Sequence, residues 1–216
     1  PPYHFFSSTS KGKLQGSTKL RLTEKQTEQL RQYESLLLTW NKTHNLISRK
    51  QTKNIEDHIQ DSLSVCQLLG ENVLDLGSGG GFPGIPIAIA SPKKNIFLIE
   101  RKRGRAAFLL NSTNKLGLKN TTVINKSSEE LQPDELPNPL DIITRAFGHP
   151  RKAISATKKL LETPGMCLKM MKTHPIDWAK DLPNSYLINK IENIKTKGKD
   201  KPRILVTIVH KKKCTQ

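Results

Sequence analysis

Residues 72–90 of the chain are Asn-Val-Leu-Asp-Leu-Gly-Ser-Gly-Gly-Gly-Phe-Pro-Gly-Ile-Pro-Ile-Ala-Ile-Ala. The apolar run at 73–76 is long enough for one buried strand, and glycines follow it at 77 and 79–81. An apolar segment then begins near Gly84, with Pro86 where the first turn of a helix tolerates it. Strand, glycine turn and helix form the opening of a nucleotide-binding βαβ unit, in which glycines let the backbone approach a ligand closely. The alternative is a plain tight turn.

The rest of the chain continues this alternation. Helices are predicted at 24–40, 55–69, 84–90, 104–116 and 150–161, and strands at 73–76, 96–99, 121–125, 141–144, 166–169, 186–194 and 204–210. The pattern predicts an α/β, Rossmann-like fold with a mostly parallel sheet covered on both faces. No helix separates the last two strands, so we expect an antiparallel hairpin at the sheet edge. We divide the chain into a basic tail (1–23), an N-terminal helical cap (24–70) and a Rossmann-like domain (71–213).

Two acidic residues indicate which cofactor the glycine turn would hold. Asp75 lies two residues before Gly77, and the apolar run at 96–99 ends in Glu100, which can accept hydrogen bonds from two ribose hydroxyls. An aspartate at the end of the first strand would repel the pyrophosphate of a dinucleotide but suits a cationic ligand. S-adenosylmethionine has a ribose, an adenine, a sulfonium and an amino group, and no phosphate. The pattern therefore favours S-adenosylmethionine over NAD.

Composition indicates the kind of partner. The chain has 216 residues, and 36 Lys and Arg against 19 Asp and Glu give a net charge of +17. This charge predicts a polyanionic partner, most plausibly nucleic acid; the alternative is that lysines merely solvate the surface. The three cysteines lack metal-ligand spacing, so we expect no metal. No apolar run approaches the ~20 residues of a membrane span, and we expect a monomer that does not bind membranes.

Residues 1–23 contain no acidic residue and several Ser, Thr, Lys and Arg residues. We assign them no fold. This composition is typical of an organellar targeting remnant, of a disordered basic tail that touches RNA phosphates, or of a fragment edge. The expected location is accordingly the bacterial cytoplasm, or an organelle matrix if the segment is a targeting remnant.

In an open parallel sheet, ligands bind beyond the carboxyl ends of the strands, which makes 75–82, Glu100, 127–129 and 144–147 the site candidates. Ser128 and Glu129 can read an adenine edge, or simply cap a helix. His58 and Asp61 share a helix face and either flank the site or form a surface hydrogen bond.

Arg145 distinguishes between methyl-transfer chemistries. Methylation of an exocyclic amine calls for Asn or Asp followed by Pro-Pro at this strand end, and methylation of a pyrimidine carbon calls for a cysteine nucleophile; neither pattern is present there. Guanine N7 carries a lone pair and needs only alignment. Arginine is the standard reader of the N7 and O6 edge of guanine. Arg145 therefore fits guanine recognition or a grip on the methionine carboxylate, and the alternative is a surface arginine.

Several motifs resemble one family closely. Trp40-Asn41 with Asn45-Leu46, His58 with Asp61-Ser62-Leu63, the turn from Asp75 extended by Phe-Pro-Gly-Ile-Pro, and Thr144-Arg145-Ala146-Phe147 occur in its order and spacing. The chain, from about 24 to 210, is similar to the bacterial-type guanine-N7 methyltransferases of small-subunit ribosomal RNA, the methyltransferase G or GidB family. The resemblance implies a class I methyltransferase that forms 7-methylguanosine in 16S rRNA of the small ribosomal subunit.

The resemblance also implies roles for individual residues. Motif matching places Gly77, Phe82, Ser128, Glu129 and Arg145 at the cofactor and Glu100 at its ribose, and Lys169 resembles a family lysine near the site. We therefore expect Arg145 and Lys169 to be catalytic. The expected cofactor-binding residues are Asp75, Gly77, Gly79, Gly81, Phe82, Glu100, Ser128, Glu129 and Arg145.

The chain departs from the family pattern at three positions. Ser127 and Gly104 stand where the family usually has Arg and Lys, and Met170 follows the lysine where the family has Gly. Arg103 and Arg105 are candidates to supply the charge missing at Gly104. These departures leave open a non-catalytic RNA-binding or ribosome-assembly protein on a methyltransferase scaffold. A methyltransferase for a protein or a small molecule would leave the charge of +17 unexplained.

Overall fold

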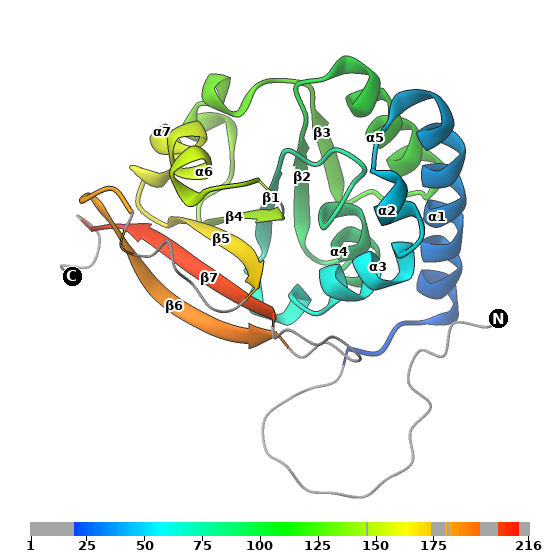
Figure 1. The fold of residues 1–216 in the computed structure, drawn as a ribbon, viewed down its shortest axis with the longest axis horizontal. Coiled ribbons are helices and arrows are strands. Elements are labelled where there is room, and N and C mark those ends of the chain that lie inside the picture. The colour runs from blue at the N-terminus through cyan, green and yellow to red at the C-terminus, as the bar shows by residue number, and fades with distance from the viewer. Residues whose placement is uncertain (1–19, 146, 174–179, 181, 195–202, 212–216) are drawn as a thin grey trace, which may run out of the picture.

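A computed structural model describes residues 20–145, 147–173, 180, 182–194 and 203–211. A single seven-stranded sheet in the order β3-β2-β1-β4-β5-β7-β6 forms its centre (Figure 1). Residues 1–19 of the tail predicted at 1–23 lie outside the described residues, as do the Lys-rich stretches at 195–202 and 212–213. The strands are β1 (Asn72–Leu76), β2 (Asn95–Ile99), β3 (Thr121–Ile124), β4 (Leu140–Arg145), β5 (Met166–Thr173), β6 (Tyr186–Ile194) and β7 (Arg203–His210).

The first five strands are parallel, and β7 runs antiparallel to both β5 and β6. The α/β class and the antiparallel hairpin at the sheet edge are thereby confirmed. All carboxyl ends of the parallel strands point to one edge, so the loops after β1, β2, β3 and β4 meet there.

Helices cover both faces of the sheet (Figure 1). Two clusters of buried hydrophobic side chains lie between the helices and the sheet. One packs the N-terminal helices against one face of the sheet, and the other packs the helices that follow β4 against the opposite face. On the first face lie α1 (Glu24–His44), α2 (Arg49–Thr52), α3 (Ile55–Leu63), α4 (Gly84–Ala90) and α5 (Arg103–Lys115), and on the second lie α6 (Pro150–Ala156) and α7 (Lys158–Leu161).

Helix α1 begins where the sequence predicted it. The Thr23 side chain accepts a hydrogen bond from the Gln26 amide, and the Gln26 side chain accepts one from the Thr23 amide, which forms a capping box. Leu30, Tyr33 and Leu37 are buried on one face of α1, as helical spacing requires.

Several element boundaries differ from the predictions. The helix predicted at 24–40 continues to His44. The helix predicted at 55–69 ends at Leu63, where Ser64 Oγ bonds the Asp61 carbonyl (2.5 Å), and a short 3₁₀ turn, Cys66–Leu68, follows. The helix predicted at 150–161 is divided at Thr157, whose Oγ1 bonds the Ala153 carbonyl at 2.7 Å. The strand predicted at 166–169 continues to Thr173, because its pairing with β7 extends to Arg203.

Candidate functional site

The turn after β1 has a backbone that only glycine adopts readily. Gly77, Gly79 and Gly81 have φ values of +72°, +53° and +91°. At Gly84, the first residue of α4, a Cβ atom would lie 2.2 Å from Leu98 Cδ2. The helix therefore packs directly on the sheet, and the turn presents bare backbone at the carboxyl end of β1.

Asp75 is buried beneath this turn, with 1% of its surface exposed. Its Oδ2 accepts a hydrogen bond from the Gly84 amide at 3.0 Å, while Oδ1 has no hydrogen-bond partner among the described residues. Burial raises the pKa of the carboxyl group to about 7, although the Gly84 amide, the Ser78 hydroxyl and the Arg145 charge oppose the rise. This carboxyl group would be stabilised by a cationic ligand.

Glu100 lies directly after β2, and two backbone amides orient its carboxylate. Oε2 accepts a hydrogen bond from Gly79 at 3.1 Å, and Oε1 accepts one from Lys102 at 2.9 Å. Each carboxylate oxygen can accept a second hydrogen bond. The contact with Gly79 places Glu100 against the glycine turn.

Ser128 and Glu129 lie in a 3₁₀ turn, Ser128–Glu130, after β3. Ser127 caps this turn through a capping box with Glu130, and its hydroxyl also donates to the Glu129 carboxylate. The Ser127 hydroxyl is the main reason why the pKa of Glu129 is lowered. The helix-cap interpretation therefore applies to Ser127, the residue before the expected pair.

Arg145, the last residue of β4, reaches helix α3. Its Nη2 lies 2.7 Å from His58 Nδ1, its Nη1 donates to the His58 carbonyl at 3.3 Å, and its Cζ lies 5.2 Å from the centre of the Phe82 ring. Because a guanidinium cannot accept hydrogen bonds, Nδ1 is the acceptor. His58 therefore positions the Arg145 side chain.

The helix face shared by His58 and Asp61 serves two contacts. Asp61 is buried and pairs with Arg203 of β7 at 3.4 Å, and its charge also acts on Arg145. The spacing of three residues indicated a common face, but the sequence does not show which arginine each side chain would meet.

Aromatic side chains complete the floor of the site. The Phe82 ring lies 5.5 Å from Tyr33 and 5.7 Å from His58, and the Tyr33 hydroxyl donates to the Gly80 carbonyl at 2.6 Å. The Phe147 ring lies beside Gly77, where a Cβ atom would come within 3.3 Å of it. Phe147 lies in the predicted site stretch 144–147, whereas Tyr33 is a contact of the glycine turn that the site prediction omitted. The spacing around Tyr33 indicated only a core position on α1.

Lys169 does not lie with the residues around the glycine turn. Lys169 Nζ bonds the Leu68 carbonyl at 2.6 Å and pairs with Asp141 at 3.0 Å. It also lines a separate hollow of about 380 Å³ beside β6 and β7. Because β5 continues to Thr173, Lys169 lies in mid-strand, level with Ile143, and not at the strand end predicted from the sequence; the resemblance alone had placed it near the site.

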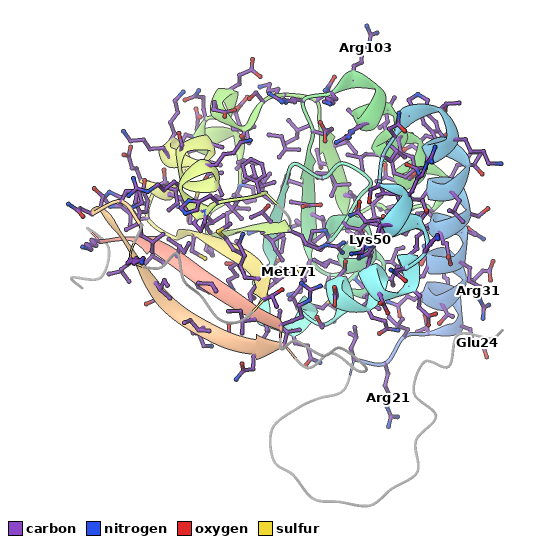
Figure 2. All side chains as sticks on the ribbon, in the orientation of Figure 1. Arg21, Glu24, Arg31, Lys50, Arg103 and Met171 are labelled. Atoms are coloured by element: carbon purple, nitrogen blue, oxygen red, sulfur yellow. The ribbon has the colours of Figure 1, made fainter. Side chains whose placement is uncertain are left out.

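The departures from the family pattern are accommodated locally. Gly104 faces His44, whose Cδ2 would be 3.2 Å from a Cβ atom there. Arg105 turns toward the glycine turn and donates to the Asn45 carbonyl at 3.1 Å, whereas Arg103 points away from the sheet (Figure 2). Arg105 is therefore the arginine placed to supply charge near Gly104. Met170 is fully buried, and it pairs with Thr144 and Val206 in the sheet.

Two further features are absent from the described part of the chain. No helix there is both long enough and apolar enough to cross a membrane. No group of three or more His, Cys, Asp or Glu side chains in these same residues could hold a metal ion.

Comparison with known proteins gives concordant matches. A family model described as GidB, rRNA small subunit methyltransferase G, matches residues 26–206. The chain is 35% identical over 194 residues to ribosomal RNA small subunit methyltransferase G of Chromobacterium violaceum, covering 88% of this chain and 91% of that protein. It is 35% identical over 197 residues to the protein of that name from Vibrio campbellii, covering 90% and 92%. A SAM dependent methyltransferase from Aquifex aeolicus has a similar fold, with a TM-score of 0.51 and 14% identity over 80% of this chain and 98% of that one.

Proposed function

The chain belongs to the rRNA small subunit methyltransferase G family, and from this premise we propose that it methylates N7 of a guanine in 16S ribosomal RNA with S-adenosylmethionine as donor. The main support for the proposal is that Arg145 lies next to the glycine turn, where its guanidinium group packs over the Phe82 ring.

The residues around the turn fit S-adenosylmethionine. Asp75 has a buried oxygen without a partner among the described residues and suits a cationic group. Glu100 is oriented by Gly79 and suits two ribose hydroxyls. Gly77, Gly79, Gly81 and Phe82 would border the cofactor, with Ser128 and Glu129 toward its adenine.

When bound, S-adenosylmethionine supplies an electrophilic methyl group on a sulfonium. The methyl group would pass from sulfur to N7 of guanine, whose own lone pair would form the new bond, so no residue would have to remove a proton. The chain needs to align the two reactants and exclude water. Arg145 has five N–H donors, so it can keep its contacts with His58 while a donor reaches N7 or O6 of guanine, or the methionine carboxylate.

The cysteines support N7 chemistry over methylation of a pyrimidine carbon. Of the two that the structure describes, Cys66 is buried, and burial raises the pKa of its thiol to about 11. Cys167 lies within β5, with its Sγ 3.1 Å from Asp141 Oδ1. Neither is placed at the glycine turn as a nucleophile would be.

We propose that the partner is 16S rRNA, alone or within the small ribosomal subunit, and that the chain acts as a monomer without a metal. The named relatives come from bacteria, which supports the bacterial cytoplasm as the place of action.

The replacement of family residues at Ser127 and Gly104 supports one rival, a non-catalytic RNA-binding protein with this fold. Isothermal calorimetry with S-adenosylmethionine separates the two functions. Micromolar binding together with turnover would exclude the rival, and the absence of binding would favour it.

The decisive experiment is complementation of a strain that lacks its own methyltransferase G. The gene should restore 7-methylguanosine in 16S rRNA, measured by mass spectrometry of rRNA fragments. Arg145→Ala should restore less than about a fifth of that level, because a lost arginine–guanine contact costs about 1–3 kcal/mol, a factor of about five or more. The matched control is Arg151→Ala, which removes an exposed arginine of α6. Full modification by Arg145→Ala would refute the assigned role of Arg145.

A further inference from the structure

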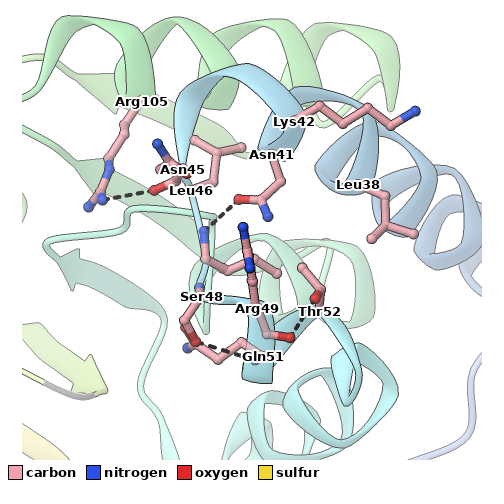
Figure 3. Close-up of a pocket in the computed structure, with 11 residues that line it drawn as sticks. Leu38, Asn41, Lys42, Asn45, Leu46, Ser48, Arg49, Gln51, Thr52 and Arg105 are labelled. Carbon is pink, nitrogen blue, oxygen red and sulfur yellow. Dashed lines mark hydrogen bonds between the residues drawn. The ribbon is translucent and has the colours of Figure 1, made fainter.

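A large hollow lies next to the glycine turn but outside the site described above. The end of α1, the turn that follows it, α2 and the first turn of α5 surround this hollow, which has a volume of about 1050 Å³ (Figure 3). We call it the α1–α2 pocket.

The lining of the α1–α2 pocket is basic. Lys42, Arg49 and Arg105 line it, and no Asp or Glu is among the described residues that do so. Three amide side chains add hydrogen-bonding groups, namely Asn41, Asn45 and Gln51. Positive charge is abundant on this chain, but here the cations surround a concave surface. Such a surface attracts a phosphate-bearing ligand from more than one side.

Local hydrogen bonds hold the wall of the pocket in place. Asn41 Oδ1 accepts from the Ile47 amide at 2.9 Å, and a capping box joins Ser48 to Gln51. Asn45 ends α1 in the left-handed conformation, with φ of +47°, and its carbonyl accepts from Arg105. The pocket is therefore preformed, which lowers the entropic cost of binding a ligand.

The pocket and the glycine turn share a wall. A Cβ atom at Gly80 would lie 2.9 Å from Ile47 Cγ2, and one at Gly79 would lie 3.8 Å from Arg105 Nη1. Ile47 and Arg105 both line the pocket. Only the side chains of Ile47 and Arg105 would thus separate a ligand in the pocket from the glycine turn.

We propose that the α1–α2 pocket binds the sugar-phosphate backbone of the substrate RNA beside the target guanine, an inference that rests on the proposed function. RNA is the occupant that the observations favour. The volume exceeds that of a single phosphate, the charge suits consecutive phosphates, and the shared wall places a flanking nucleotide close to the methyl-transfer site. The contacts are to phosphate and sugar, so they position the RNA without reading its sequence.

The test compares two pairs of charge reversals in the full chain. The pocket variant is Lys42→Glu with Arg49→Glu, both at exposed positions. The control variant is Lys93→Glu with Lys119→Glu, also exposed but preceding β2 and β3 at the opposite end of the sheet. Filter binding to transcribed 16S rRNA is measured at several salt concentrations, and binding of S-adenosylmethionine is measured by calorimetry.

The pocket variant should bind 16S rRNA on the order of 10-fold more weakly than the control. The slope of log affinity against log salt concentration should become shallower by about one to two, because two phosphate contacts are lost. Its affinity for S-adenosylmethionine should equal that of the unaltered chain. Equal RNA binding by the two variants would overturn the inference. Failure of the proposed function gives a different result, because the unaltered chain would then bind no S-adenosylmethionine.

Discussion

Neutralising Asp75 should stabilise the protein at high pH while weakening its hold on the cofactor. The Asp75 carboxyl is buried, with a folded-state pKa of about 7 against an ordinary value of 3.8. Between these two values the folded chain keeps a proton that the unfolded chain releases. The free energy of unfolding therefore falls as pH rises through this window, and the loss is complete above the folded-state pKa.

The magnitude follows from the size of the pKa shift. Asp75→Asn does not titrate, so the difference in unfolding free energy between variant and unaltered chain should change by about 3 kcal/mol from about pH 5 to about pH 8, in favour of the variant. The absolute gain is smaller, because the new amide N–H group replaces a buried oxygen that has no partner among the described residues. Burying that N–H group without a hydrogen-bond partner costs about 1–3 kcal/mol.

Urea denaturation followed by tryptophan fluorescence at a series of pH values measures the change. Asp134→Asn, which neutralises an exposed carboxyl group, controls for the loss of one negative charge. Two parallel pH profiles for Asp75→Asn and the unaltered chain would refute the assignment of a buried, titrating carboxyl group.

Cofactor binding provides the second measurement. Ionised Asp75 should attract the cationic donor, so the affinity of the unaltered chain for S-adenosylmethionine should rise with pH up to about pH 7. Asp75→Asn should bind about 10-fold more weakly at pH 8, a difference of about 1.4 kcal/mol, with little pH dependence. Calorimetry that finds equal affinities at pH 8 would exclude this role.

Three further changes have expected outcomes. Glu100→Gln should lower the affinity for S-adenosylmethionine by about 10-fold in calorimetry, because charge-assisted hydrogen bonds are roughly twice as strong as neutral ones; unchanged affinity would argue against ribose binding. Gly84→Ala should lower the thermal midpoint strongly or prevent folding, because its Cβ would lie 2.2 Å from Leu98 Cδ2, and a midpoint like that of the unaltered chain would contradict this packing. Tyr33→Phe should cost about 1–3 kcal/mol in urea denaturation, because it leaves the Gly80 carbonyl without its buried donor; no measurable loss would mean that another donor replaces it.

Local sequence was sufficient to predict the elements and the cofactor turn. The glycines after 73–76 predicted a turn whose backbone can approach a ligand closely, and the positive φ values of Gly77, Gly79 and Gly81 agree with this turn, because other residues rarely adopt them. The apolar run that ends before Glu100 placed that carboxylate at a strand end, since parallel strands bring their carboxyl ends to one edge. These conclusions depend on neighbours in the chain, and such neighbours are visible in the sequence.

Contacts between distant segments were decided only by the tertiary structure. His58 and Arg145 are 87 positions apart, and the rotation of α3 against the sheet determines that they meet. Lys169 lies away from the site because antiparallel pairing with β7 lengthens β5, which no local pattern in 166–173 indicated. The α1–α2 pocket likewise requires Arg105 to approach the end of α1. Local propensity fixes a strand or a turn, whereas register, strand length and helix packing depend on partners supplied by other parts of the chain.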